Sequence, residues 1–286
     1  MMNNIFLCSF ASDDLSRSKK RFIKQASFFY RNTNIKIYDQ KDLFKNFQEK
    51  IKKNLSKENR AFGYGIWKPY IILDFFKQIP ENSVLQYSDI GCHFNPNGIN
   101  RFRNYIKFAN KYKSLVFEYD GKKLGKNNID LHFQKYFEFQ YSKKDLIKYF
   151  RYEKNSKILN SPQIWSGSFF LKKTLRNKII LKNWLKVMKK NHLIDGTKSK
   201  NFEDPRFIES RWDQSVFSIL SKKNRFFKLS SSECEWAENG KKRIWSHLEN
   251  YPITARRDLK RNLIIRFKNR QQRTFRRYKK LILSKF

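Results

Sequence analysis

The chain has 286 residues, 40% of them apolar and 17% aromatic, so it can bury a substantial core and is not wholly disordered. Its 63 Lys and Arg outnumber 25 Asp and Glu, which gives a formal net charge of +38. This excess indicates an anionic partner and leaves nucleic acid, a membrane surface and phosphorylated small molecules open. The three cysteines show no disulfide or metal spacing, which favours a reducing compartment.

Predicted strands and helices alternate along most of the chain. Apolar runs bounded by turn residues predict strands over residues 4–12, 34–40, 83–91, 114–120 and 164–174. Helical spacing of apolar residues predicts helices over residues 13–30, 41–55, 68–79, 99–112, 142–150 (with Ser142 as N-cap), 179–188 and 214–220. We therefore expect an α/β fold with a mainly parallel sheet flanked by helices, in one domain over residues 1–252.

The last 34 residues, 253–286, differ from the rest because they hold thirteen Lys and Arg but one acid, Asp258. Their apolar residues fall near one helical stripe, made by Leu259, Leu263, Phe267, Phe275, Tyr278 and Ile282. This pattern predicts a basic amphipathic helical tail that binds an anionic membrane surface. The start of the chain lacks the basic segment of a secretory signal, and no apolar run predicts a transmembrane helix. We expect a cytoplasmic protein, peripheral on the inner face of the cell membrane.

Two acidic positions are candidates for chemistry. Asp89 follows a predicted buried strand, where it can hold a divalent ion or a sugar hydroxyl, or simply form a turn. Asp213 and Gln214 begin a predicted helix, where Asp213 can equally be an N-cap and Gln214 an exposed polar residue. Gly167 lies inside a predicted strand, which often marks the close approach of a ligand or of backbone. Each position taken alone leaves both interpretations open.

The order of these motifs resembles that of GT-A glycosyltransferases, particularly the retaining glycogenin-like and lipopolysaccharide galactosyltransferase group and bacterial surface-polysaccharide transferases. The matching segments are Trp67-Lys68-Pro69, Tyr87-Ser88-Asp89-Ile90-Gly91-Cys92, Ser166-Gly167 and Asp213-Gln214. The resemblance spans roughly residues 4–250 and implies a GT-A-like, Rossmann-like fold. It also implies an enzyme that moves a sugar from a nucleotide-sugar donor to a glycan or lipid-linked glycan acceptor. The product would be a surface glycan, in lipopolysaccharide or capsule.

The resemblance implies a role for particular side chains. Asp213 would contact donor-sugar hydroxyls and Gln214 would lie near the anomeric carbon, which makes both catalytic and favours retention, although Asp213 can equally act as the general base of an inverting enzyme. Trp212 can stack on a sugar face or belong to the core. The expected donor-binding residues are Ser9, Phe10, Ala11, Trp67, Lys68, Asp89, Gly91, Ser166, Gly167 and Arg211.

Metal dependence stays open at the sequence level. Asp89 and His247 match metal-binding positions of the resembled group, for Mn²⁺ or Mg²⁺, and His93 is a further candidate. Gly91, however, replaces the second Asp of the Asp-x-Asp motif and so removes a ligand. The leaving diphosphate needs a cation, and Lys68 or Arg211 can supply it instead.

The main alternative is a nucleic-acid-binding protein that uses the basic, aromatic-rich segments 101–113 and 270–280. The sequence lacks zinc-finger spacing, an RNP-like aromatic signature and a Walker-type loop. A basic tail on a membrane-associated transferase explains the same charge, so we expect no nucleic-acid partner.

Overall fold

The structure is a computed structural model that describes residues 4–43, 47, 49, 55, 61–121, 123–126, 129–239, 242–256, 258, 271, 274, 275 and 278. Most of the predicted helix over residues 41–55 lies outside these residues, as does most of the predicted helical tail. The division into a body over residues 1–252 and a tail over 253–286 stays a prediction. No helix in the described part of the chain is both long enough and apolar enough to cross a membrane.

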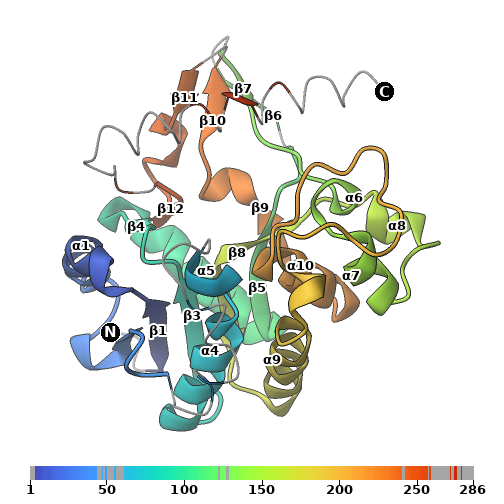
Figure 1. Cartoon of the computed structure of the whole chain (residues 1–286). Coiled ribbons are helices and arrows are strands. Elements are labelled where there is room, and N and C mark those ends of the chain that lie inside the picture. Colours follow the sequence, from blue (N-terminus) through green and yellow to red (C-terminus); the bar gives the residue numbers. More distant parts are fainter. Residues whose placement is uncertain are drawn as a thin grey trace.

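A six-stranded sheet forms the centre of the molecule (Figure 1). Its strands lie in the order β2 (Ile35–Tyr38), β1 (Ile5–Phe10), β3 (Val84–Ser88), β8 (Ile164–Lys172), β5 (Ser114–Glu118) and β9 (Lys228–Ser230). All strand pairs are parallel except those that β8 makes with β3 and β5. The expected α/β fold with a mainly parallel sheet is therefore confirmed, with β8 running against the other five strands.

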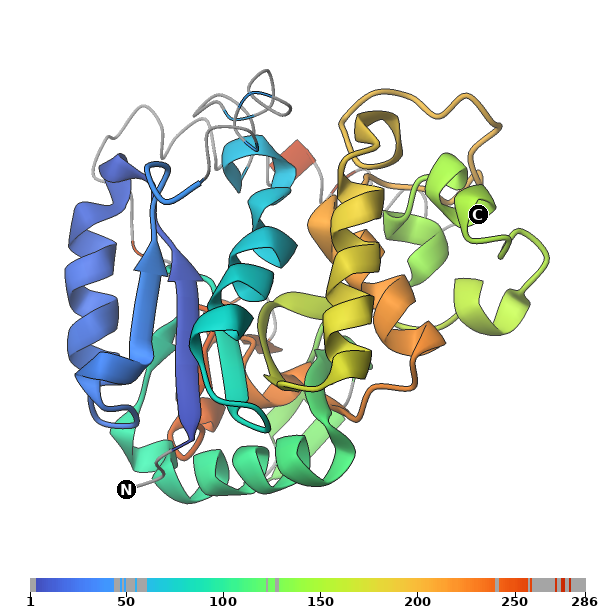
Figure 2. The ribbon, with the colours of Figure 1, turned by 90° about the horizontal axis from the view of Figure 1, so that it is seen from below.

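Helices cover both faces of this sheet. One face carries α4 (Trp67–Gln78), α9 (Leu175–Met188) and α10 (Asp213–Lys223), which Figure 2 shows next to one another. The other face carries α1 (Ser16–Ala26) and α5 (Ile99–Tyr112). Alternate residues of β3 and β8 point to opposite faces, as strand geometry requires, so Tyr87 and Phe169 pack under α4 and α9 while Val84 and Phe170 pack under α1 and α5.

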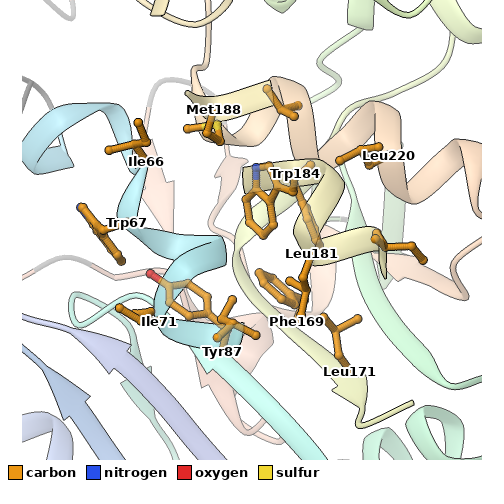
Figure 3. Packing of buried hydrophobic residues seen from close by; sticks show 14 of the residues in the cluster. Ile66, Trp67, Ile71, Tyr87, Phe169, Leu171, Leu181, Trp184, Met188 and Leu220 are labelled. Carbon is orange, nitrogen blue, oxygen red and sulfur yellow. The ribbon is translucent and has the colours of Figure 1, made fainter. Parts of the chain in front are cut away.

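The core beneath α4 and α9 is rich in aromatic side chains. Figure 3 shows Ile71, Tyr87, Phe169, Leu181 and Trp184 meeting there. Tyr87 stacks on Phe169 with ring centroids 5.3 Å apart, and Phe217 of α10 stacks on the same ring at 4.3 Å. Because large rings bury much apolar area and fix one another's orientation, this core holds the first turns of α4 and α10 at defined positions.

Smaller elements complete the body. The remaining α-helices whose bounds the structure describes are α3 (Ala61–Tyr64), α6 (Glu138–Tyr141), α7 (Lys144–Tyr149) and α8 (Ser156–Leu159). A second sheet joins β11 (Lys242–Ile244), β10 (Ala237–Asn239), β7 (Ile129–His132) and β6 (Lys123–Lys126), and β12 (Ile253–Thr254) pairs with β4 (His93–Phe94). Short 3-10 turns lie at Asp13–Leu15, Asn32–Asn34, Pro96–Gly98, Asn191–Leu193, Ser231–Glu233 and Ser246–Leu248.

The predicted N-cap at Ser142 is wrong. The residue before α7 is Lys143, whereas Ser142 follows the last residue of α6 in an extended conformation. The Ser142 hydroxyl donates instead to the carboxylate of Glu138 at 2.7 Å. A buried carboxylate attracts hydroxyl donors strongly, and here that demand outweighs the capping preference of serine.

Candidate active site

The antiparallel direction of β8 brings two predicted motifs to one edge of the sheet. Asp89 directly follows β3, and its backbone N–H donates to the carbonyl of Gly167 in β8 at 2.7 Å. Ser88 and Ser168 are register partners. Since β8 starts at the edge where β3 ends, Ser166 near the start of β8 lies beside the loop that carries Asp89.

Lys68 joins these motifs to the third. It lies in the first turn of α4 with its side chain 4% exposed, and its ammonium is 2.6 Å from Asp213 Oδ2. The same nitrogen is 3.4 Å from Asp89 Oδ1 and 3.1 Å from the Ser166 carbonyl. An ammonium has three protons to donate, so Lys68 is fully occupied by these oxygens. We call Lys68, Asp89, Ser166 and Asp213 the lysine-centred cluster.

A left-handed turn precedes Lys68. Phe62, Gly63, Tyr64 and Gly65 all have positive φ values, between 51° and 90°. Such values strain residues that carry a Cβ, and a fold keeps them where the surroundings require them, commonly at functional sites. At Gly65 a Cβ would lie 2.9 Å from the carboxyl carbon of Asp213, so only glycine lets this turn pack against the carboxylate.

Asp213 is the first residue of α10, and the side chain of Trp212 before it does not cap the helix. Trp212 has φ 50° and ψ −116°, a strained conformation that is fixed by neighbouring hydrogen bonds, including Trp212 N–H to Ser210 Oγ at 3.2 Å. Asp213 itself accepts from Ser166 Oγ at 2.8 Å as well as from Lys68. The Asp213 carboxylate therefore binds within the cluster, and Asp213 is not an ordinary N-cap of α10.

The cluster contains two carboxylates and one ammonium in a largely buried setting. Burial alone would lower the pKa of Lys68, but the carboxylates of Asp213 and Asp89 together raise it, so Lys68 is charged at neutral pH. Burial raises the pKa of Asp213 above its ordinary 3.8, and Lys68 opposes this shift. The cluster has one more carboxylate than it has ammonium groups. Because Asp213 is the nearer partner of Lys68, the additional negative charge lies at Asp89, whose side chain is 43% exposed.

Three side-chain oxygens near these residues accept no hydrogen bond from any described residue: Asp89 Oδ2, Asp213 Oδ1 and Gln214 Oε1. The opposite atoms of the same groups are firmly held. Tyr87 OH donates to Asp89 Oδ1 at 2.7 Å, and Gln214 Nε2 donates to Gln163 Oε1 at 2.9 Å. Acceptors fixed from behind in this way suit a ligand that presents several hydroxyl groups.

Several of the expected donor-binding residues pack beside the cluster. Phe10 at the end of β1 stacks on Trp67 with ring centroids 4.2 Å apart, directly before Lys68. Ser9 is fully buried, and Ala11 N–H donates to the Tyr38 carbonyl at 2.9 Å. The structure brings the end of β1 and the start of α4 together, and these side chains are mostly core. Their role in donor binding stays a prediction.

Arg211, Gly167 and Gly91 stand in different settings. The Arg211 guanidinium lies over the rings of Tyr136 at 3.9 Å and Tyr141 at 4.3 Å, so it is held by aromatic side chains rather than by the cluster. At Gly167 an added Cβ would clash with the indole of Trp165, which explains the glycine through packing within β8. Gly91 lies in the turn after Asp89.

The residues do not form a metal site by themselves. Among the described residues, no group of three or more His, Cys, Asp or Glu side chains is arranged to hold a metal ion. His247 Nε2 lies 2.9 Å from the Glu235 carbonyl, and His93 Nε2 lies 3.2 Å from Asp258 Oδ1. Asp89 is a single carboxylate whose Oδ1 is already engaged, which falls short of the oxygen ligands that Mg²⁺ or Mn²⁺ requires from a protein alone.

Some functional features were missed from sequence. The hydroxyl of Tyr87, the role of Gly65 and the pairing of Gln214 with Gln163 emerge only from the fold. The glycines of "GYGIW" gave a signal for the turn, but nothing in the sequence marked Gln163, which lies 51 residues from its partner.

No family model matches the sequence, and no curated protein matches it. Similar solved structures include a glycosyltransferase involved in the glycosylation of the major capsid of PBCV-1, with 11% identity, 87% of this chain and 92% of that chain covered, and a TM-score of 0.46. Another is the apo form of mouse Xyloside xylosyltransferase 1, with 9% identity, 81% and 87% covered, and a TM-score of 0.42. A third is the apo form of the glycosyltransferase GlyE in Streptococcus pneumoniae TIGR4, with 14% identity, 80% and 46% covered, and a TM-score of 0.37. At these low TM-scores the likenesses assign the chain to no family and no activity.

Proposed function

We propose that this protein is a glycosyltransferase that takes a sugar from a nucleotide-sugar donor and passes it to a glycan acceptor. The observation that carries this proposal is the lysine-centred cluster. Residues from three motifs up to 145 positions apart converge at the end of β3, and they leave the acceptor oxygens of Asp89 and Asp213 available to a ligand. Ligands commonly bind at the carboxyl ends of strands in open α/β sheets, which supports a substrate site here.

In this proposal Asp213 and Gln214 act at the transferred sugar. The buried Lys68 and Ser166 hold Asp213 Oδ2, so that Oδ1 can accept from a sugar hydroxyl. Gln214 follows on the same helix start, and its carbonyl oxygen can stabilise positive charge that develops at the anomeric carbon. Retention of configuration is proposed from the resemblance alone, since Asp213 could also serve as the general base of an inverting enzyme.

Asp89 is proposed to bind the nucleotide part of the donor, through the ribose hydroxyls or through a divalent ion that arrives with the diphosphate. Its Oδ2 accepts no hydrogen bond from the described residues, and its side chain is the most exposed acid of the cluster. A Mg²⁺ ion that uses one carboxylate and the substrate phosphates fits this position, because such ions commonly bind that way. Lys68 then acts mainly by orienting the two carboxylates.

A thermal-shift panel tests this function directly. UDP-, GDP-, CMP- and dTDP-sugars are compared with and without Mn²⁺, beside a short oligonucleotide at several salt concentrations. A ligand that binds the folded state stabilises it by about 2.7 kcal/mol at a hundredfold excess over its dissociation constant. We expect one nucleotide class to raise the melting temperature. Stabilisation by the oligonucleotide alone, lost steeply as salt rises, would identify a nucleic-acid-binding protein and overturn the proposal.

The acceptor is proposed to be a surface glycan, in lipopolysaccharide or capsule, reached at the inner face of the cell membrane through the basic tail. The support is the composition of residues 253–286. Asp258 pairs with Arg21 at 2.8 Å, so a truncation after residue 258 keeps this contact. Loss of residues 259–286 should weaken binding to vesicles that contain anionic lipid, and unchanged binding in a flotation assay would remove the tail from membrane binding.

A further inference from the structure

A buried chain of hydrogen bonds runs from the interior to Gln214. Glu138 of α6 is fully buried, and its carboxylate accepts from Lys222 Nζ at 2.6 Å, Ser142 Oγ at 2.7 Å and Gln163 Nε2 at 3.1 Å. The hydroxyl of Ser218 donates to the same carboxylate. Gln163, also fully buried, then accepts from Gln214 through its other end. The mechanism proposed above leaves Glu138, Gln163 and Lys222 without a role.

The protons in this chain can point only one way. A lysine ammonium can only donate, so the ion pair with Lys222 makes Glu138 a charged group that can only accept. The hydroxyl proton of Ser142 is committed to Glu138, so Ser142 can only accept from Gln163, whose Nε2 lies 3.3 Å away. Both neighbours of this end of Gln163 are therefore acceptors, which fixes its NH₂ group there.

The same logic extends to Gln214. With its NH₂ group facing Glu138 and Ser142, Gln163 presents an amide oxygen to its other neighbour, and an amide oxygen can only accept. Gln214 must therefore turn its NH₂ group toward Gln163, at 2.9 Å. Its carbonyl oxygen is left facing away from Gln163, and no donor among the described residues reaches it.

We propose that Glu138, Lys222 and Gln163 are positioning residues that fix the orientation of the Gln214 amide, with its carbonyl oxygen toward the transferred sugar. This inference rests on the proposed function. The two ends of an amide are nearly equal in size but opposite in polarity, so a reversed Gln214 would place N–H protons where positive charge develops. A buried ion pair removes that ambiguity because its charges cannot exchange roles.

The test removes the polarity of the chain without leaving an unpaired charge. The double variant Glu138→Gln/Lys222→Met replaces both ions with neutral side chains of similar length, a change that buried ion pairs often tolerate. An amide at position 138 can donate or accept, so Gln163 and Gln214 can reverse. We expect kcat for transfer to fall about 10-fold, less than the roughly 10²–10³-fold that follows loss of an electrostatic group itself. The KM for the donor should change little, because the effect falls on the transition state.

A rescue separates orientation from general damage. Gln214→Glu carries an oxygen at both ends, one of which faces the acceptor oxygen of Gln163, so this variant starts from a lower kcat. Adding the double substitution lets Gln163 turn its NH₂ group toward Glu at position 214, so kcat should not fall further. The control is Lys143→Met/Asp195→Asn, which removes another ion pair, between the buried ammonium of Lys143 and the partly exposed carboxylate of Asp195, 3.0 Å apart, with no bond to Gln214. Its kcat should match the original. An equal fall in kcat with either residue at position 214, or no fall at all, overturns the proposal.

A second readout does not depend on turnover. In ¹⁵N-labelled protein, the side-chain NH₂ signals of Gln214 are those absent from Gln214→Glu. Slow exchange of one of these protons is expected in the original chain and should be lost in Glu138→Gln/Lys222→Met. Unchanged protection overturns the positioning role even if the enzyme transfers sugar. Lost protection in a protein that binds no nucleotide sugar keeps the positioning role and refutes the proposed function instead.

Discussion

Two buried lysines of this protein each lie 2.6 Å from a carboxylate, yet their surroundings differ. Lys222 pairs with one carboxylate, Glu138, whose oxygens already accept from hydroxyl and amide donors. Burial lowers the pKa of Lys222 more than Glu138 raises it. For Lys68 the same cost of burial is exceeded by two carboxylates, one of them half-exposed. A saturated pair suits fixed positioning, whereas a pair with spare acceptor oxygens can receive a ligand.

The largest expected effect breaks the cluster around Lys68. Asp213→Asn should lower kcat/KM for transfer by about 10²–10³-fold or more, because the substitution removes the charge that holds the site together. Asp89→Ala should act in the same direction. Steady-state kinetics measures both, with Asp195→Asn as a control outside the cluster. Turnover at the original rate in either variant would remove that residue from the mechanism.

Loss of a carboxylate should cost more unfolding free energy at the Glu138–Lys222 pair than at the Asp213–Lys68 pair, the reverse of the expected order for activity. Glu138→Gln leaves the buried ammonium of Lys222 without its carboxylate and should cost about 3–5 kcal/mol of unfolding free energy. Asp213→Asn should cost less, since Asp89 remains 3.4 Å from Lys68 as a second counter-charge. Urea denaturation at neutral pH gives both values. Equal costs would mean that Asp89 does not compensate Lys68.

Glycine at position 65 offers a smaller and more local test. Gly65→Ala adds a Cβ 2.9 Å from the Asp213 carboxyl carbon at a φ of +73°, and should cost about 1–3 kcal/mol while also reducing transfer. Gly196→Ala meets nothing within 4 Å and should stay within about 0.5 kcal/mol of the original. Thermal and urea unfolding give the loss of stability in each variant. Similar losses in Gly65→Ala and Gly196→Ala would show that the turn before Lys68 can move to accept a side chain at position 65.

The smallest effect concerns pH. Because burial raises the pKa of Asp213 above 3.8, the acid limb of kcat/KM should lie above that value. Between 3.8 and its raised pKa, the folded protein binds more protons at Asp213 than the unfolded chain does. Its contribution to stability therefore falls as pH rises through this window, by at most about 1.4 kcal/mol per pH unit. Asp213→Asn should lack this slope in urea unfolding series, and an identical slope would contradict the assignment.

The α/β fold could be predicted from sequence because its signals are local. Apolar runs and helical spacing found β1, β3, β5, β8 and α5 with bounds close to those observed. The direction of β8 could not be predicted, because strand polarity depends on which neighbours it pairs with. The motifs marked Lys68, Asp89, Ser166 and Asp213, which the fold brings together. Local sequence carries no sign of Gln163 or Glu138, because their importance lies in contacts between distant segments.

Lys68 and Asp213 lie 145 positions apart in the sequence, and this separation has a consequence for synthesis of the protein. A growing chain that has released α4 and β3 already holds Lys68 and Asp89, but the first turn of α10 follows only much later. Until then, the apolar core beneath α4 lacks the side chains of α10, and Lys68 lacks its nearest counter-ion, Asp213. Contacts of such sequence separation form slowly and expose apolar surface in the meantime. An unfinished polypeptide of this kind has not yet assembled the lysine-centred cluster, so the site forms only once α10 has been made.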